Sequence, residues 1–223
     1  MQRFFKTDKG DYAQNDVFIG VMVPEVRKIA AKYAKEVDFE EIRELLNSKI
    51  HEERQCALLI LVCMFEKAAS EEQKQKILEF YIDPSNLRNI NKWDLVDLSC
   101  YKILGEYLLK KPEKIAILYD FAGSDNIWIR RIAMVSTLTL IRNNHFLPAV
   151  KIAEILLTDK HPLIHKATGW MMRELGKRDR EILLKFLEKN HQKMARISLS
   201  YAIERLSNSE KAKYRKASAR IGN

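Results

Sequence analysis

Apolar residues recur along most of the chain at intervals of three and four positions. One run shows the spacing i, i+3, i+4, i+7 in Cys56, Ala57, Leu59, Ile60, Cys63 and Met64. This spacing is typical of an α-helix with one buried face. No segment shows a convincing strand or hairpin pattern, so the sequence predicts an all-α protein.

Signals for helix starts accompany this pattern. Pro24 and Pro112 fit the first helical position, where a missing N–H costs nothing. Asn91 is a plausible N-cap. Capping boxes, in which two side chains satisfy the first free amides of a helix, are expected at Ser70 with Gln73 and at Ser207 with Glu210, and Asp38 with Glu41 resembles one.

The helices recur with a period. Four segments share a basic residue, a small residue and an apolar helix: E-R-Q-C-A-L-L at 53–59, I-R-R-I-A-M-V at 129–135, I-H-K-A-T-G-W at 164–170 and M-A-R-I-S-L-S at 194–200. W-D-L-V-D-L-S at 93–99 fills the gap between the first two. Aligning Ala57, Asp97, Ala133, Ala167 and Ser200 gives steps of 40, 36, 34 and 33 residues. Each step holds two helices, which predicts a HEAT- or ARM-like superhelix forming a single domain over residues 1–223.

Composition excludes several classes of protein. The 223 residues include only 7 Gly and 5 Pro, too few for a turn-rich β-sandwich. No apolar run approaches the ~18 residues of a membrane span, and the first residues lack a signal peptide. The three cysteines are expected to be reduced thiols, which favours a cytoplasmic protein.

The positive charge is unevenly distributed. The formal charge is +9, and residues 160–223 hold 16 Lys and Arg against 6 Asp and Glu, so residues 1–159 carry −1. In a solenoid the second helices of the pairs line the concave surface. Here they begin with Arg54, Arg130, Arg131, Lys166 and Arg196, which predicts a basic concave cleft able to follow nucleic-acid phosphates. Two alternatives are a tail that only aids solubility and, for Arg54 beside Glu52 and Glu53, a structural ion pair.

The stretch N-K-W-D-L-V-D-L-S-C at 91–100 is the main candidate for chemistry. Trp93 and Asp97 lie four residues apart and therefore on one face of a helix. A carboxylate in an apolar helix is costly unless it is paired, so Asp97 calls for a role. Asp94 is interpreted as a first-turn acid that suits the helix dipole. Considered alone, Trp93 and Trp170 are better interpreted as packing residues between repeats, and Trp128 is expected to be one.

No metal or other cofactor is expected. His161 and His165 have the i, i+4 spacing of a metal pair, but no third ligand is evident and His161 precedes Pro162 at a helix start. The cysteines form no close pair.

Four stretches carry a resemblance to a known family. They are F-F-K-T-D-K-G-D-Y-A-Q-N-D-V-F-I-G-V-M-V-P-E-V-R-K near the start, N-K-W-D-L-V-D, W-I-R-R-I-A, and H-P-L-I-H-K-A-T-G-W-M-M-R-E-L-G-K. The chain resembles the DNA alkylation repair enzymes of the AlkD type, which are HEAT-like-repeat DNA glycosylases. The resemblance implies duplex DNA in the concave cleft and release of cationic alkylated purines such as 3-methyladenine and 7-methylguanine. It also implies that the lesion stays near the base stack.

The resemblance extends to single residues. Trp93 and Asp97 look like the family's tryptophan and catalytic aspartate, and Trp170 looks like its second site tryptophan. Arg131 looks like its phosphate-contacting arginine, with Arg130 a near competitor. Lys166 and Arg196 are expected to add phosphate contacts, and Tyr12 is a further candidate for the cleft.

The leading hypothesis is therefore a monomeric alkylpurine DNA glycosylase in base excision repair, acting on the bacterial nucleoid. Its partner would be double-stranded DNA containing alkylated purines. One alternative is a non-catalytic HEAT-repeat protein that recognises distorted DNA, which explains the basic groove but not the Trp93/Asp97 pair. Another is a protein–protein scaffold, which does not explain the basic groove.

Overall fold

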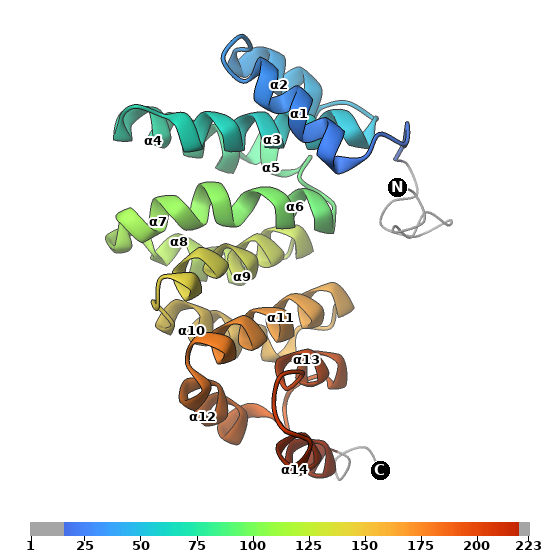
Figure 1. Ribbon diagram of the computed structural model, residues 1–223, viewed down its shortest axis with the longest axis vertical. Coiled ribbons are helices and arrows are strands. Elements are labelled where there is room, and N and C mark those ends of the chain that lie inside the picture. The colour runs from blue at the N-terminus through green and yellow to red at the C-terminus, as the bar shows by residue number, and fades with distance from the viewer. Residues whose placement is uncertain (1–15, 219–223) are drawn as a thin grey trace. The chain divides into compact units, whose positions relative to one another are not determined.

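The computed structural model describes residues 16–218, and the side chains as far as residue 215. Helices form almost all of the regular structure within this range (Figure 1). The described residues contain no β-strand, only an isolated bridge between Val17 and Ile50. The prediction of an all-α protein is confirmed.

The chain divides after Tyr107 into two compact units. The expectation of a single domain over residues 1–223 therefore stays a prediction. The elements of the first unit are α1 (Val23–Tyr33), α2 (Phe39–Leu46), α3 (His51–Lys67), α4 (Glu71–Ile82), α5 (Pro84–Leu87), α6 (Trp93–Cys100) and the π-helical turn η2 (Tyr101–Gly105).

Helix α3 is the centre of the first unit. It packs against α1, α2, α4 and α6, and residues on all of its sides are buried (Figure 1). A helix that is apolar all round needs such complete coverage. The start of α3 nevertheless carries the polar run H-E-E-R, and three of these four side chains are buried as well.

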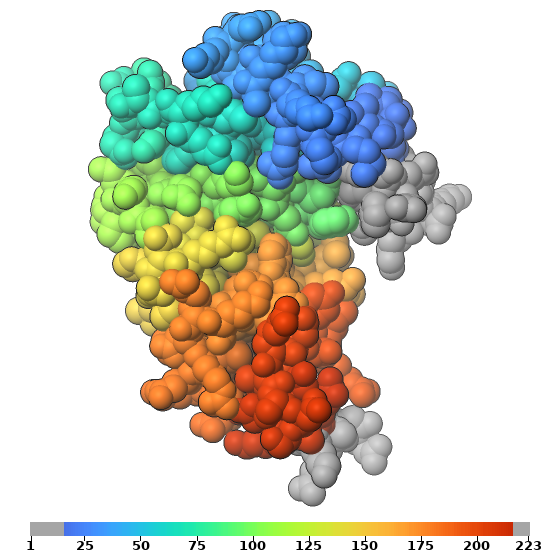
Figure 2. Space-filling view, viewed as in Figure 1, coloured from blue at the N-terminus to red at the C-terminus, as the bar shows by residue number. Residues whose placement is uncertain are grey.

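The second unit follows α7 (Glu106–Lys110), which spans the boundary. Its elements are the 3-10 turn η3 (Pro112–Lys114), α8 (Ala116–Ala122), α9 (Ile127–Arg142), α10 (Leu147–Ile155), the 3-10 turn η4 (Leu156–Thr158), α11 (Pro162–Arg178), α12 (Arg180–Asn190), α13 (Arg196–Ala202) and α14 (Asn208–Ser218). Helix α11 packs between α9 and α13, so the second helices of successive pairs are stacked (Figure 1). Side chains fill the spaces between the ribbons within each unit (Figure 2).

The closest approach between α11 and α13 requires a glycine. A Cβ atom on Gly169 would overlap the backbone carbonyl of Ser198 and lie 2.6 Å from Cβ of Tyr201. Only a residue without a side chain allows the two backbones to come this near. Gly169 therefore sets the packing of the helix that carries Trp170.

The repeat alignment agrees with the structure. Its five reference positions, Ala57, Asp97, Ala133, Ala167 and Ser200, lie in α3, α6, α9, α11 and α13. Other helices lie between these in the sequence: α10 between α9 and α11, α12 between α11 and α13, α4 and α5 between α3 and α6, and α7 and α8 between α6 and α9. The helical-repeat pattern predicted from the sequence is therefore present within each unit.

Most of the predicted helix starts are observed. Asp38 with Glu41 forms a complete capping box, and so does Ser207 with Glu210. Ser70 accepts a hydrogen bond from the amide of Gln73. The prediction of Asn91 as an N-cap is wrong: the N-cap of α6 is Lys92 and makes no side-chain cap bond.

Two further features concern the expectations about membrane spans and about the cysteines. In the range that the structure covers, no helix is both long enough and apolar enough to cross a bilayer. The cysteines are free thiols, Cys100 buried and Cys56 and Cys63 half-buried.

Candidate functional site

Trp93 and Asp97 lie one turn apart at the beginning of α6. Trp93 is the first residue of the helix, and both side chains are partly exposed. Most of the helix's other residues, including Leu95, Val96 and Leu98, are buried. Trp93 and Asp97 therefore belong to the accessible face of α6, and the spacing predicted from the sequence places them on the same side.

A π-helical turn follows directly. Residues Tyr101–Gly105 have the wider hydrogen-bonding pattern of a π-helix, which is rare and occurs frequently at functional sites. Tyr101, four residues after Asp97, is half-buried. The irregularity therefore begins four residues after the candidate carboxylate.

Asp94 has a different environment from Asp97. Its Oδ2 lies 2.7 Å from Nε2 of His51 and accepts a hydrogen bond of 3.1 Å from Nε2 of Gln55. The Asp94 side chain is only 11% exposed. Its interpretation as a simple first-turn acid is incomplete, because the carboxylate joins α6 to the start of α3.

His51 connects Asp94 to a second carboxylate. Its Nδ1 lies 3.2 Å from Oδ2 of Asp16, which also accepts from Nη2 of Arg54 at 2.6 Å. Lys92 Nζ lies 3.3 Å from the other oxygen of Asp16. The structural alternative raised for Arg54 is thus the one observed.

Asn91 completes this buried cluster, which we call the His51 network: Asp16, His51, Arg54, Gln55, Asn91, Lys92 and Asp94. The Oδ1 of Asn91 accepts hydrogen bonds of 2.9 Å from both Arg54 and Lys92. This contact explains why Asn91 does not cap α6. Its side-chain oxygen lies between the two cations and accepts a hydrogen bond from each.

Burial and charge shift the ionisation of the network in opposite directions. Burial alone lowers the pKa of His51, but the hydrogen bonds with Asp16 and Asp94 outweigh it and raise that pKa above 6.5. Burial raises the pKa of Asp16, yet His51, Arg54 and Lys92 together lower it. For Lys92, burial lowers the pKa more than the attraction of Asp16 raises it.

The segment before α1 is fixed to the same place. The amide of Val17 donates to the Lys49 carbonyl at 3.1 Å, and the His51 amide donates to the Val17 carbonyl at 2.8 Å. The ring of Phe18 stacks on that of His51, 4.8 Å between centroids. Two sequence motifs about 75 residues apart, D-V-F-I-G at 16–20 and N-K-W-D at 91–94, therefore meet at the start of α3.

Glu52 and Gly20 hold the end of this segment. The Glu52 carboxylate accepts from the amides of Ile19 and Gly20 at 3.1 and 2.9 Å. Gly20 has a φ of +87°, which favours glycine.

Sequence reasoning missed the roles of Asp16, His51 and Lys92. The available signal was the polar run H-E-E-R at the start of a helix that is otherwise apolar on all sides.

The two arginines of α9 have protein partners. Arg130 Nε lies 2.6 Å from Oδ2 of Asp159, and its Nη1 donates to the carbonyls of Ser124 and Asp125. Arg131 is 5% exposed and donates to the Leu163 carbonyl at the start of α11. Both side chains thus connect parts of the second unit, and their phosphate contacts stay predictions.

Lys166, Trp170 and Arg196 are more accessible. Lys166 and Trp170 are half-buried and one turn apart on α11, whereas Arg196 is exposed at the first position of α13. Within the described part of the chain, Lys166 and Arg196 take part in none of the salt bridges found. Other cations of α11, α12 and α14 do form them, with Glu174, Glu204, Glu210, Glu154 and Glu188 as partners.

The remaining candidates have structural roles or lie elsewhere. Trp128 is buried, as expected for a packing residue. His161 accepts from the Leu163 amide through Nδ1, and His165 contacts the Asp159 carbonyl through Nε2. Among the described residues, no group of His, Cys, Asp and Glu is placed to hold a metal ion. Tyr12 lies outside the described residues.

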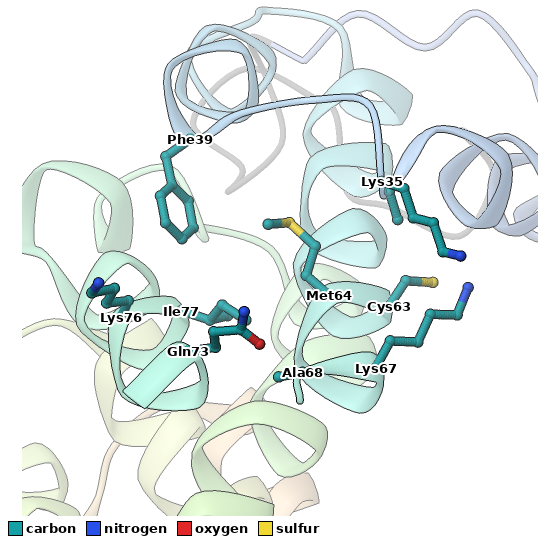
Figure 3. Close-up of a pocket in the computed structure, with 10 residues that line it drawn as sticks. Lys35, Phe39, Cys63, Met64, Lys67, Ala68, Gln73, Lys76 and Ile77 are labelled. Carbon is teal, nitrogen blue, oxygen red and sulfur yellow. The ribbon is translucent and has the colours of Figure 1, made fainter. Parts of the chain in front are cut away.

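A cavity of about 300 Å³ opens elsewhere in the first unit (Figure 3). Phe39, Met64 and Ile77 line it, with Lys35 and Lys67 at its margin. Neither Trp93 nor Asp97 contributes to its wall, so the cavity is separate from the accessible face of α6.

Comparisons with solved structures agree on the fold. A protein described as a predicted DNA alkylation repair enzyme from Enterococcus faecalis superposes with a TM-score of 0.69 at 19% identity, covering 88% of this chain and 92% of that one. AlkD2 from Streptococcus mutans gives a TM-score of 0.58 at 17% identity, covering 91% of each chain. At such identities the likeness shows a common HEAT-like helical-repeat fold.

Sequence comparison identifies the family. No curated protein sequence matches the chain. A family model described as DNA alkylation repair enzyme matches residues 1–206, nearly the whole chain. This protein therefore belongs to the DNA alkylation repair enzyme family.

Proposed function

We propose that this protein is a DNA glycosylase that hydrolyses the N-glycosidic bond of cationic alkylated purines, 3-methyladenine and 7-methylguanine, in duplex DNA. The observation that carries the proposal is the pair Trp93 and Asp97, one turn apart on the accessible face of α6. The neighbouring Asp94 has its carboxylate in the His51 network. We assign the chemistry to Asp97 because it shares the accessible face of α6 with Trp93.

The proposed reaction does not need a strong general acid from the protein. An alkylated purine already carries positive charge and leaves readily, while the sugar becomes an oxocarbenium-like cation in the transition state. An ionised carboxylate held in place stabilises that developing charge. We assign this role, and the orientation of the attacking water, to Asp97.

The indoles suit the same substrate. The face of a tryptophan ring attracts cations, so Trp93 is assigned to contact the lesion nucleotide beside Asp97. Trp170 of α11 is assigned to the same nucleotide, as the family resemblance implies. No metal and no other cofactor takes part in the proposed reaction.

The sugar-phosphate backbone is assigned to the cations at the starts of the stacked helices. The accessibility of Lys166 and Arg196 and the absence of salt bridges from their side chains, within the described chain, support direct phosphate contacts. Arg131 and Arg130 are assigned to phosphates near the lesion, although their present partners are protein groups. The proposed cleft is concave and basic, and the protein acts on DNA as a monomer.

The direct test incubates the purified protein with randomly methylated duplex DNA and separates the released bases by chromatography. The proposal expects free 3-methyladenine and 7-methylguanine in amounts above spontaneous release, with matching abasic sites in the DNA. Binding to the duplex without release above the spontaneous rate would favour the non-catalytic DNA-binding alternative. A protein that neither binds the duplex nor releases base would favour the scaffold alternative.

A further inference from the structure

The first residue of α6 is flanked by two charged residues that have little exposed surface. Trp93 is flanked by Lys92, which is 4% exposed, and by Asp94, whose side chain is 11% exposed. The charged groups of both residues contribute to the His51 network. The position of the Trp93 backbone therefore depends on contacts made by its two neighbours.

His51 connects the two carboxylates of the network. Its side chain has no exposed surface, and its two ring nitrogens face two different carboxylates, Asp16 at 3.2 Å and Asp94 at 2.7 Å. Only the doubly protonated imidazolium has a hydrogen to donate to both. The neutral ring would present a lone pair to one of the carboxylates, which is repulsive.

The surroundings leave Asp94 few other partners. Among the described residues, the charged groups around His51 include Asp16 from the segment before α1, Arg54 from its own helix, and Lys92 and Asp94 from the start of α6. Oδ1 of Asp94 is buried without a hydrogen-bond partner within the described chain. If the contact with His51 were lost, Gln55 would be the partner that remains.

We propose that protonated His51 is a positioning residue for Trp93, fixing the start of α6 by bridging Asp16 and Asp94. This inference rests on the proposed glycosylase function in so far as it concerns base release. His51 lies under α6 and does not touch the substrate. Deprotonation loosens the Asp94 contact, shifts the first turn of α6 and misaligns Trp93 and Asp97 together.

The rate of base release and the affinity for DNA should respond differently to the protonation of His51. The cations assigned to phosphates are Lys166, Arg196, Arg130 and Arg131, none of which belongs to the His51 network. Deprotonating His51 should therefore slow base release and leave the affinity for DNA unchanged. Misplacing reacting groups by a fraction of an ångström to 1 Å slows a reaction on the order of 10- to 100-fold.

The first experiment follows the indole N–H resonance of Trp93 by NMR as pH rises, with the signal assigned from its loss in Trp93→Phe. The wild type is expected to show a titration with a midpoint above 6.5, the ordinary pKa of histidine. The matched control is His191→Gln in the second unit, where Nδ1 of the histidine contacts the Leu187 carbonyl. The control should titrate like the wild type, and His51→Gln should not titrate.

A second variant keeps the histidine and removes one of its charged partners. In Asp94→Asn the imidazolium loses part of its stabilisation, so the Trp93 midpoint should move to lower pH. An unchanged midpoint in Asp94→Asn, or the same titration in His51→Gln as in the wild type, would overturn the proposal. A wild-type Trp93 signal that does not respond to pH would also overturn it.

Single-turnover base release completes the test. The wild-type rate should fall with the same midpoint as the Trp93 signal, and His51→Gln should lack this step while binding DNA as tightly as the wild type. The NMR titration needs no activity. A wild type that releases no base but shows the Trp93 titration would contradict the proposed function and leave the positioning of Trp93 by His51 standing.

Discussion

The guanidinium Nε of Arg130 lies 2.6 Å from Oδ2 of Asp159, and the other oxygen of that carboxylate accepts from the amide of His161 at the start of α11. The Asp159 side chain is 5% exposed and that of Arg130 is 17% exposed. The pair therefore ties the start of α9 to the start of α11, the helix that carries Lys166 and Trp170.

Arg130→Ala is expected to destabilise the protein by about 3 kcal/mol, because it leaves a buried carboxylate without its cation. Urea denaturation monitored by circular dichroism measures this loss. Because Arg130 is also assigned to a phosphate, the slope of log K against log salt concentration should fall by about 1 in the folded variant. Reduced stability with a wild-type salt slope would limit Arg130 to its structural pair with Asp159.

Gly169→Ala tests the close packing of α11 on α13. The added methyl group meets backbone atoms that cannot move easily, and such overpacking costs about 1 to 3 kcal/mol. The matched control is Gly123→Ala, where the nearest atom to the new Cβ would be 3.6 Å away, an ordinary contact. Equal melting temperatures for the two variants would contradict the described packing.

The His51 network also makes stability depend on pH. Because the pKa of His51 is raised in the folded state, its ionic contacts stabilise fully below the ordinary value of 6.5 and are lost as pH rises through the folded pKa. The lowered pKa of Asp16 gives a contribution that is present above its ordinary value and lost in acid.

The difference in unfolding free energy between wild type and His51→Gln should therefore be larger at about pH 6 than at about pH 9. Urea denaturation at the two pH values measures it. His191→Gln serves again as the control and should show no comparable change. A difference that grows as the pH rises would mean that His51 is buried in its neutral form.

The salt dependence of DNA binding shows which of the cations at the starts of the stacked helices contact phosphates. Lys166→Ala and Arg196→Ala should each reduce the slope of log K against log salt concentration by about 1, irrespective of DNA sequence. Lys189→Ala is the control, because that lysine is on α12 and pairs with Glu154 at 2.8 Å. A slope equal to the wild-type value in Arg196→Ala would exclude Arg196 from the phosphate contacts.

Arg131→Ala should weaken DNA binding more than these variants and also lower stability, because the side chain is buried against the Leu163 carbonyl. Reduced stability with a wild-type salt slope would leave Arg131 a structural role alone.

The sequence predicted the helices because periodic apolar spacing and capping residues act locally. The box at Asp38 and Glu41 forms within one turn and depends on little else. The step between Ala133 and Ala167 likewise reflects a repeated local pattern, and it located α9 and α11 correctly.

The His51 network could not be predicted in the same way. Most of its contacts join residues at least 35 positions apart, such as His51 to Asp16 and His51 to Asp94, and no local rule pairs them. Asn91 illustrates the difference: its position suits an N-cap, but its side chain accepts hydrogen bonds from the distant Arg54 and from the adjacent Lys92. Likewise, a basic residue at a helix start gave no sign of whether it would pair internally, as Arg130 does.

The central claim is that the Asp97 carboxylate stabilises the cationic transition state beside Trp93. Its most direct test is the single-turnover rate of 7-methylguanine release from duplex DNA by wild type and by Asp97→Asn, with DNA affinity measured in parallel. The account predicts unchanged affinity and a rate lower by on the order of 10²-fold or more, as expected for the loss of an electrostatic contact to the transition state. Release by Asp97→Asn at the wild-type rate would contradict it.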